Sequence, residues 1–401
     1  MKKRERDKEL PSSEFTKTDI NIPINRENFF KEFLTKVNDF KIDNSYFIKI
    51  IKYIDDYILT KSLGIEQQLI ELSNAYYSEK LVLVFGAGLS KNFGLPDWNT
   101  LLQELILITF QQESHQSYDN ANVLAKLYTH FFNPNPLISA RFLRNYFIKE
   151  EISSFEELVR KILYKNFKKD SLSKSNLLDE ILQFCVAPGK SPNLDSIITY
   201  NYDDVLETFL SKQKIKIPFR PIFKVGDKPR LDELPIYHVH GFLPQKGKLT
   251  ESHKITLSED IYHEQYTNIY SWNNIIQINK FRDNACLFIG VSLTDPNLRR
   301  LLDIANTQRG EETPQHFMFK RKFQINELNE LLNKYLKENK EIYDEKVMAN
   351  LKLEDTIKHL VNMKQKFEES DALSFGISII WIDDYGDIPN ILKKIRRRPN
   401  K

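Results

Sequence analysis

The sequence predicts an α/β protein with a doubly wound, Rossmann-like parallel sheet of about six strands, helical insertions and an N-terminal helical extension. Three observations support this prediction. Residues 81–85 are all apolar, as in a strand that is buried on both faces of a parallel sheet. A glycine turn and an amphipathic helical stretch follow this run directly. Further short apolar runs then alternate with helical segments toward the end of the sequence.

The other strands are expected at short apolar or β-branched segments that turn residues bound, namely residues 195–200, 236–240, 285–291, 315–320 and 376–382. Residues 98–185 have helical periodicity, with a break at Pro134 and Pro136, and are interpreted as a helical insertion. The lysine- and glutamate-rich residues 324–369 are interpreted as a helical hairpin that is inserted before the last strand.

Two domains are predicted. Residues 1–75 comprise a charged lead and the helical extension, and residues 76–401 contain the sheet and its insertions. Apolar residues recur at helical spacing from residue 26 to residue 77. These helices could pack on the sheet or dock another subunit, and the sequence leaves both interpretations open.

Composition excludes several classes of protein. The 401 residues, 41% of them hydrophobic, suit a globular protein, and no apolar run approaches the ~20 residues of a membrane span. The N-terminus lacks a signal sequence, so a cytoplasmic location is expected. A net charge of +3 does not indicate nucleic-acid binding, and the basic residues 393–398 are interpreted as a solvated helix end. Cys185 and Cys286 are too far apart for a zinc motif and are expected to be reduced and buried.

Small and polar residues follow four predicted strands at the point where each strand ends. They are Gly86, Ala87, Gly88 and Ser90; then Thr199, Asn201 and Asp203; then His240 and Gly241; and finally Gly290, Ser292 and Asp295. Open parallel sheets bind ligands at the carboxyl ends of their strands, and a glycine turn before a helix can cradle a phosphate. The glycine spacing differs from the G-x-G-x-x-G fingerprint, which disfavours a hydride-transfer enzyme.

Residue chemistry suggests roles for these positions. His240 is the expected general base, because imidazole titrates near neutral pH; the alternative is a structural histidine, which is the interpretation given to His238. Asn201 could bind a substrate hydroxyl, orient a water or cap a turn. Asp203 could accept a hydrogen bond from a carboxamide or cap a helix. Ser90, Ser292 and Asp295 are interpreted as ligand contacts or caps rather than nucleophiles.

The ordered motifs GAGLS, GLPDW, TYNYD, HVHG and FIGVSLTDPNL resemble the sirtuin-like family, most closely its bacterial branch of NAD-consuming antiphage-defence proteins. The resemblance runs from about residue 80 to the end of the sequence and implies binding of NAD and cleavage of its nicotinamide–ribose bond. It implies that His240 and Asn201 are catalytic, with Asp203 at the carboxamide. It further implies a cofactor-binding set of Gly86, Ala87, Gly88, Ser90, Asp97, Trp98, Thr199, Asp203, Gly290, Ser292 and Asp295.

The sequence departs from deacylating sirtuins in two places. It cannot supply their four-cysteine zinc ribbon, so no metal is expected, and Asn99 replaces the arginine that follows their aromatic residue. The resemblance therefore implies an NAD hydrolase that yields nicotinamide and ADP-ribose and depletes NAD in abortive infection. The alternatives are a non-catalytic module that senses NAD or ADP-ribose, and a protein ADP-ribosyltransferase; retention of Asn201 and His240 favours an enzyme.

Such an activity must be gated, because free NAD hydrolysis would kill the host. Gating is expected from homo-oligomerisation or from a partner such as a HerA-type hexameric ATPase, with residues 26–77 or 324–369 as the contact. Some relatives carry a further C-terminal ligand-sensing domain, whereas here the last strand and helix are expected to end the chain. No membrane or direct nucleic-acid partner is expected.

Overall fold

The computed structural model describes residues 62–114, 118–132, 134–149, 154–186, 193–214, 217–310, 315–338 and 353–397, with isolated positions between 48 and 58. The chain divides into two units, Met1–Tyr53 and Ile54–Lys401, and the fold described below lies in the second. Most of the helical extension predicted between residues 26 and 58 lies outside the described residues.

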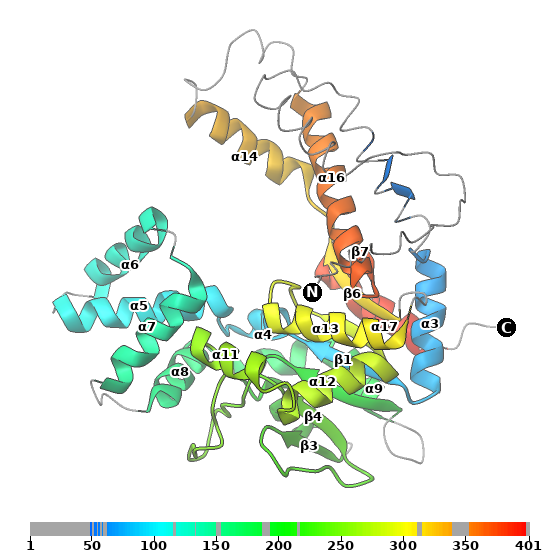
Figure 1. Cartoon of the computed structure of the whole chain (residues 1–401), viewed down its shortest axis with the longest axis horizontal. Helices are drawn as coiled ribbons and strands as arrows, with labels where there is room; N and C mark the ends of the chain where they lie inside the picture. The colour runs from blue at the N-terminus through cyan, green and yellow to red at the C-terminus, as the bar shows by residue number, and fades with distance from the viewer. Residues whose placement is uncertain are drawn as a thin grey trace, which may run out of the picture. The chain divides into compact units, whose positions relative to one another are not determined.

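A parallel sheet of seven strands forms the centre of the second unit (Figure 1). The strands are β1 (Leu81–Phe85), β2 (Leu194–Thr199), β3 (Phe219–Ile222), β4 (Leu234–His238), β5 (Ala285–Ile289), β6 (His316–Arg321) and β7 (Ile377–Ile382). Their order is β3-β4-β2-β1-β5-β6-β7, and every pairing is parallel. The predicted α/β, Rossmann-like class is confirmed.

The strand prediction was wrong in two details. Strand β3 was missed because its sequence, FRPI, contains a proline and an arginine; both are tolerated there because β3 is an edge strand. Strands β4 and β5 end at His238 and Ile289, each two residues before the end of the predicted strand. His240 therefore lies in the turn after β4, where Gly241 adopts a φ of 107°.

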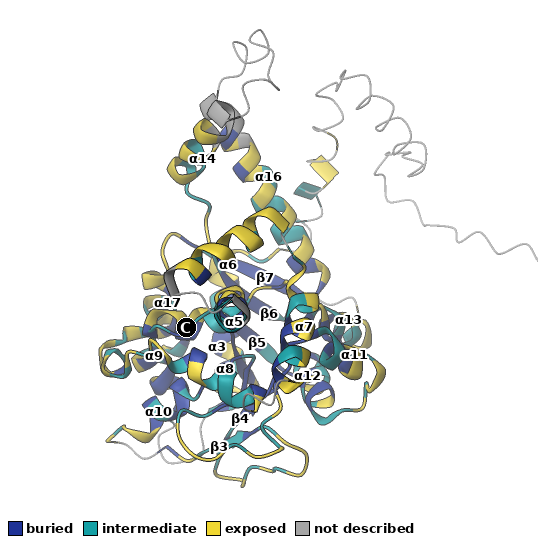
Figure 2. Ribbon diagram, turned by 90° about the vertical axis from the view of Figure 1, so that its left-hand side faces the viewer, coloured by how far each residue is buried: buried dark blue, intermediate teal, exposed yellow. Residues whose placement is uncertain are grey.

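Apolar side chains of the strands alternate between two layers of helices, and the strands are buried between them (Figure 2). One layer contains Leu81, Leu83 and Phe85 of β1 together with α3 (Ile65–Tyr77), α9 (Asn176–Cys185), α10 (Val205–Ser211) and α17 (Ile388–Arg396). The other contains Val82 and Val84 with α12 (Trp272–Asp283), α13 (Pro296–Arg309) and α16 (Leu353–Ser374). Burial of β1 on both faces explains its uninterrupted apolar sequence.

Helices occupy the region between β1 and β2. They are α4 (Ala87–Ser90), η1 (Lys91–Phe93), α5 (Trp98–Ser114), α6 (Tyr118–Phe132), α7 (Pro136–Lys149), α8 (Phe155–Tyr164) and η2 (Lys169–Lys174), followed by α9. Pro136 begins α7, a position at which the missing N–H of proline has no helical partner to lose. Helix α11 (Glu259–Thr267) lies between β4 and α12, and η4 (Tyr385–Asp387) lies between β7 and α17.

The predicted hairpin region contains α14 (Ile325–Glu338) and the first part of α16, which lie beside each other (Figure 1). None of the described helices is both long enough and apolar enough to cross a lipid bilayer. Cys185 and Cys286 are unpaired and buried, and burial raises the pKa of both thiols. Within the described part of the chain, no three His, Cys, Asp or Glu side chains group as ligands for a metal ion.

Candidate active site

The candidate site lies where the winding direction of the sheet changes. Strand β1 lies between β2 and β5; strands β2 to β4 lie on one side of it, and strands β5 to β7 lie on the other. In doubly wound sheets the carboxyl ends of the strands at this point form the crevice that binds ligands. The predicted site residues follow the ends of β1, β2, β4 and β5, so they gather along one edge of the sheet.

Three glycines join the turns after β1 and β5. The Gly86 N–H donates to the carbonyl of Ile289 (3.2 Å), and the Gly88 N–H donates to the carbonyl of Gly290 (3.0 Å). A Cβ atom on Gly86 or Gly88 would lie 2.6 Å from the Gly290 backbone, so neither glycine could be replaced by a residue with a side chain. The contact between the two turns by itself requires these glycines, a reason that the sequence interpretation did not include.

We call Ser90, Asn201 and Asp203 the amide cluster, because the Asn201 side chain lies at its centre. The Asn201 Nδ2 donates to the Gly86 carbonyl and to Ser90 Oγ, both at 3.1 Å. The Ser90 hydroxyl donates in turn to Asp203 Oδ1 (3.1 Å). Thr199 Oγ1 accepts the Asn201 backbone N–H (3.1 Å), which fixes the turn after β2. The tertiary structure thus joins residues that the sequence places after two different strands.

Asp203 is a buried carboxyl group. Its Oδ1 also accepts the backbone N–H of Val205 (3.1 Å), the first residue of α10, while the N-cap position of this helix is occupied by Asp204. Burial raises the pKa of Asp203 to about 6, against the lowering effect of the hydrogen bonds from Val205 and Ser90. A buried charge that titrates just below neutral pH is unusual for a residue with only a structural role.

His238 supports the amide cluster from β4. Its Nε2 lies 2.7 Å from Glu207 Oε1, and its Nδ1 lies 3.3 Å from the carbonyl of Asn201. A cavity of about 10 Å³, the room of one water molecule, lies among Asn201, Asp203, Glu207, His238 and apolar neighbours. Both ring nitrogens of His238 are engaged, which is the environment of a structural histidine.

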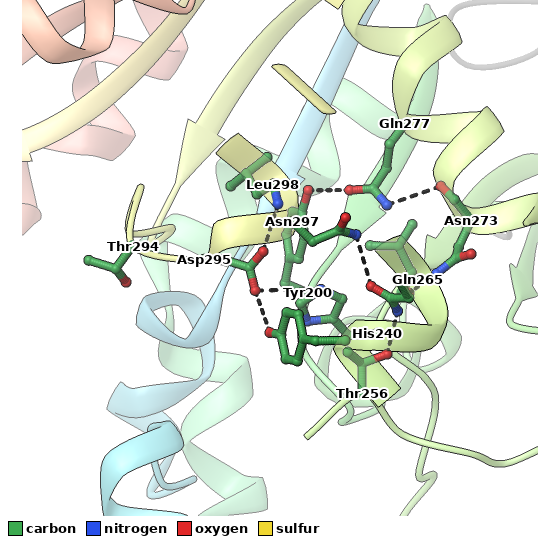
Figure 3. A network of polar contacts seen from close by, with 12 residues as sticks. Tyr200, His240, Thr256, Gln265, Asn273, Gln277, Thr294, Asp295, Asn297 and Leu298 are labelled. Atoms are coloured by element: carbon green, nitrogen blue, oxygen red, sulfur yellow. Dashed lines mark hydrogen bonds and ion pairs between the residues drawn. The ribbon is translucent and has the colours of Figure 1, made fainter. Parts of the chain in front are cut away.

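His240 belongs to a second group, the histidine cluster, which comprises His240, Tyr200, Tyr262 and Asp295. His240, Tyr200 and Asp295 are labelled in Figure 3. The His240 ring makes edge contacts with Tyr200 and Tyr262, at centroid distances of 4.8 and 6.0 Å. Its Nε2 lies 3.8 Å from Asp295 Oδ2 and is buried without a hydrogen-bond partner. Tyr262 donates its hydroxyl to the same Oδ2 (2.5 Å), while Asp295 Oδ1 accepts the Leu298 N–H (2.7 Å) and caps α13.

Two opposing effects act on His240. Burial lowers its pKa, because the charged imidazolium loses its hydration, and the Asp295 carboxylate opposes this effect. The net effect is a lowered pKa of His240, so the ring is neutral at pH 7. A neutral imidazole with an unpartnered nitrogen can accept a proton, which is the property that a general base requires.

Amide side chains fix the helices around the histidine cluster (Figure 3). Asn297 of α13 donates to Gln265 of α11 (2.8 Å), and Gln265 donates to Thr256 Oγ1 (2.7 Å). The backbone N–H of Thr256 donates to the carbonyl of His240 (2.7 Å). This chain of contacts holds the turn that carries His240 against α11 and α13.

Three predicted site residues have contacts outside both clusters. Asp97 accepts the N–H and hydroxyl of Thr100 at the start of α5. Trp98 is half-buried and packs against the hydrophobic core. Ser292 is exposed, and its hydroxyl lies 2.7 Å from that of Thr294. These contacts give the three residues local structural roles, and their predicted roles in cofactor binding stay predictions.

Sequence reasoning missed three residues that the structure brings to the site. Tyr200 lies inside the TYNYD motif, and Glu207 lies one turn along the helix from Asp203, so both had a local signal. Tyr262 lies in α11, and no motif in the sequence connects it with His240 or Asp295.

Comparison with known proteins identifies the fold family. Residues 195–343 match the family model of the SIR2-like domain. Over these residues the chain is similar to the SIR2-like domain. The match begins at β2 and includes Asn201, His240 and Asp295, whereas the glycine turn after β1 lies before it. The resemblance predicted from the motifs is confirmed.

Two curated relatives carry the name NAD(+) hydrolase ThsA. The protein of Cytobacillus dafuensis is 24% identical over 337 residues, which cover 82% of this chain and 55% of the relative. The protein of Enterococcus faecium is 23% identical over 210 residues, which cover 51% of this chain and 38% of the relative. The chain thus spans about half of the length of the first relative and less of the second.

Proposed function

We propose that the SIR2-like domain hydrolyses the nicotinamide–ribose bond of NAD+, releasing nicotinamide and ADP-ribose. The observation that carries the proposal is the pair of clusters at one edge of the sheet: a fixed amide beside a buried carboxyl, and a neutral histidine with a free nitrogen. The names of the two relatives support NAD as the substrate.

In this proposal Asn201 and Asp203 bind the nicotinamide half of NAD+. The Asn201 amide would hold a ribose hydroxyl or the attacking water, and the Asp203 carboxylate would accept a hydrogen bond from the carboxamide. The remaining predicted binding residues, including Gly86, Gly88 and Gly290, would lie along the rest of the dinucleotide. Fixed groups of this kind lower the barrier by orientation, because little rearrangement remains to be made during the reaction.

The reaction itself needs one proton transfer. The C1′–N bond breaks, nicotinamide leaves as a neutral molecule, and the ribose becomes an oxocarbenium-like cation. Water then forms a bond to C1′, and His240 accepts the proton that this water loses. The lowered pKa of His240 keeps the ring in the form that can accept this proton at neutral pH.

Burial of the site supports gating. The exposed fractions of His240, Asn201 and Asp203 are 6%, 9% and 7%, and the cavity beside Asn201 holds about one water. A dinucleotide needs a pocket of several hundred Å³, so the site must open before NAD+ can bind. We propose that self-assembly or a partner protein, such as a HerA-type ATPase, drives this opening, and that the activity depletes NAD during antiphage defence.

The test is nicotinamide release from NAD+ by the full chain, alone and coexpressed with its neighbouring genes. Wild type is compared with Asn201→Ala and His240→Ala, and the exposed residues Asn166→Ala and His263→Ala are matched controls. We expect the two site variants to lose at least about 100-fold of the release rate, while the controls retain it.

Three outcomes would contradict parts of the proposal. Equal release by all variants would exclude these two residues. Absence of release under both conditions, with NAD+ bound, would indicate a sensor. NAD+ labelled in the ADP-ribose part separates the remaining alternative, because label fixed on protein would indicate ADP-ribosyl transfer.

A further inference from the structure

We propose that Asp295 is the positioning residue of His240, and that Tyr262 limits its effect by binding the same carboxylate oxygen. The proposal rests on the proposed role of His240 as the base. It departs from the interpretation of Asp295 as a ligand contact, because the structure directs this carboxylate toward the histidine (Figure 3).

The two oxygens of Asp295 have separate partners. Oδ1 accepts the Leu298 N–H at 2.7 Å and thereby fixes the carboxylate at the first turn of α13. Oδ2 accepts the Tyr262 hydroxyl and lies 3.8 Å from His240 Nε2. A carboxylate held in this way cannot turn away from the ring, and a shift of less than about 1 Å would bring Oδ2 to hydrogen-bond distance of a protonated Nε2.

Three titratable side chains face His240 among the described residues. They are Tyr200 from the end of β2, Tyr262 from α11 and Asp295 from the cap of α13. Burial raises the pKa of both tyrosines, so they are neutral at pH 7. Asp295 is therefore the source of negative charge beside the ring.

The contacts assign opposite effects to the two neighbours. When His240 accepts a proton from water, the nearby charge of the Asp295 carboxylate stabilises the imidazolium. Tyr262 donates to the same oxygen and so weakens this stabilisation. Removing the charge of Asp295 should lower the pKa of His240, and removing the Tyr262 hydroxyl should raise it.

Asp295→Asn and Tyr262→Phe test this directly. Asparagine retains the cap of α13 and removes the charge, and phenylalanine retains the ring packing and removes the hydroxyl. Asp383→Asn, an exposed position, is the control. The readout is the pKa of His240 by NMR of histidine-labelled full chain over about pH 4 to 8, with the His240 signal identified by its loss in His240→Gln.

We expect the pKa of His240 to fall by at least about half a unit in Asp295→Asn and to rise by a similar amount in Tyr262→Phe. In the pH profile of nicotinamide release, the pH at which release falls on the acidic side should shift in the same direction as the pKa of His240. Shifts of the same sign, an unchanged pKa in Asp295→Asn, or a His240 that does not titrate in any of these proteins would overturn the proposal. If the wild type releases no nicotinamide, the proposed function fails, while the NMR titration still decides the role of Asp295.

Discussion

The two clusters at the carboxyl edge of the sheet differ in how their polar atoms are partnered. In the amide cluster, Asn201 Nδ2 makes two hydrogen bonds and Asp203 Oδ1 accepts two. In the histidine cluster, His240 Nε2 has no hydrogen bond, and its nearest carboxylate is 3.8 Å away. The first cluster is built as a fixed frame, whereas the second retains a free nitrogen that can take up a proton.

Gly290 packs against the turn after β1, whose Gly86 carbonyl accepts a hydrogen bond from Asn201, so its substitution should have the largest effect. A Cβ atom there would lie 2.7 Å from Leu89 N and 2.8 Å from the Gly88 backbone, and its φ of 69° is itself unfavourable for alanine. We expect Gly290→Ala to reduce the free energy of unfolding by about 3–5 kcal/mol, measured by chemical denaturation.

Gly226→Ala is the matched control for this prediction. Gly226 has a φ of 88° but nothing within 4 Å of the added Cβ, so only the backbone strain of about 1–2 kcal/mol should remain. Equal losses in the two variants would show that the close contact between the two turns contributes nothing.

Substitutions of His238 and His240 should separate effects on the free energy of unfolding from effects on nicotinamide release. His238→Ala removes the partner of the buried Glu207, and we expect a loss of about 2–4 kcal/mol in the free energy of unfolding. Nicotinamide release per folded molecule should change little. His240→Ala should show the reverse, with release lost and a smaller loss of stability, because its Nε2 has no hydrogen bond to lose. Equal loss of release per folded molecule in both variants would contradict the structural role assigned to His238.

Substitution of Asp203 should give the smallest change in the free energy of unfolding, and this change should be an increase rather than a loss. Its folded-state pKa of about 6 lies above the ordinary aspartate value of 3.8, so the folded protein holds this proton more tightly, and wild-type stability falls as the pH rises from about 4 to 6. Asp203→Asn removes this buried charge and should raise the free energy of unfolding at pH 8 by roughly 1–3 kcal/mol.

Nicotinamide release should decrease in the same variant, because the proposed carboxamide contact is lost. Asp303→Asn, on the exposed surface of α13, should leave both properties unchanged. A less stable Asp203→Asn protein would mean that the hydrogen bonds of the carboxylate outweigh its desolvation.

Local patterns in the sequence were sufficient for the fold class and for the edge that carries the site. Runs such as β1 and β5 are apolar throughout because they are buried on both faces, and this burial can be inferred from the sequence without knowledge of the fold. The edge strand β3 could not be read in this way, since half-burial permits Arg220 and Pro221. The glycine and polar residues that follow the strands mark the carboxyl edge, because parallel strands all end on the same side.

Only the tertiary structure determined which of these residues act together. Ser90 and Asp203 are 113 positions apart, and Tyr262 and Asp295 are 33 positions apart, yet each pair is hydrogen-bonded. Residue type and periodicity report burial and local backbone geometry, whereas such contacts depend on the strand order and on where each helix packs. The sequence by itself thus determined the class of fold and candidate residues at the strand ends. The packing of α10, α11 and α13 against the sheet divided those candidates into a hydrogen-bonded frame and a histidine with an unpartnered nitrogen.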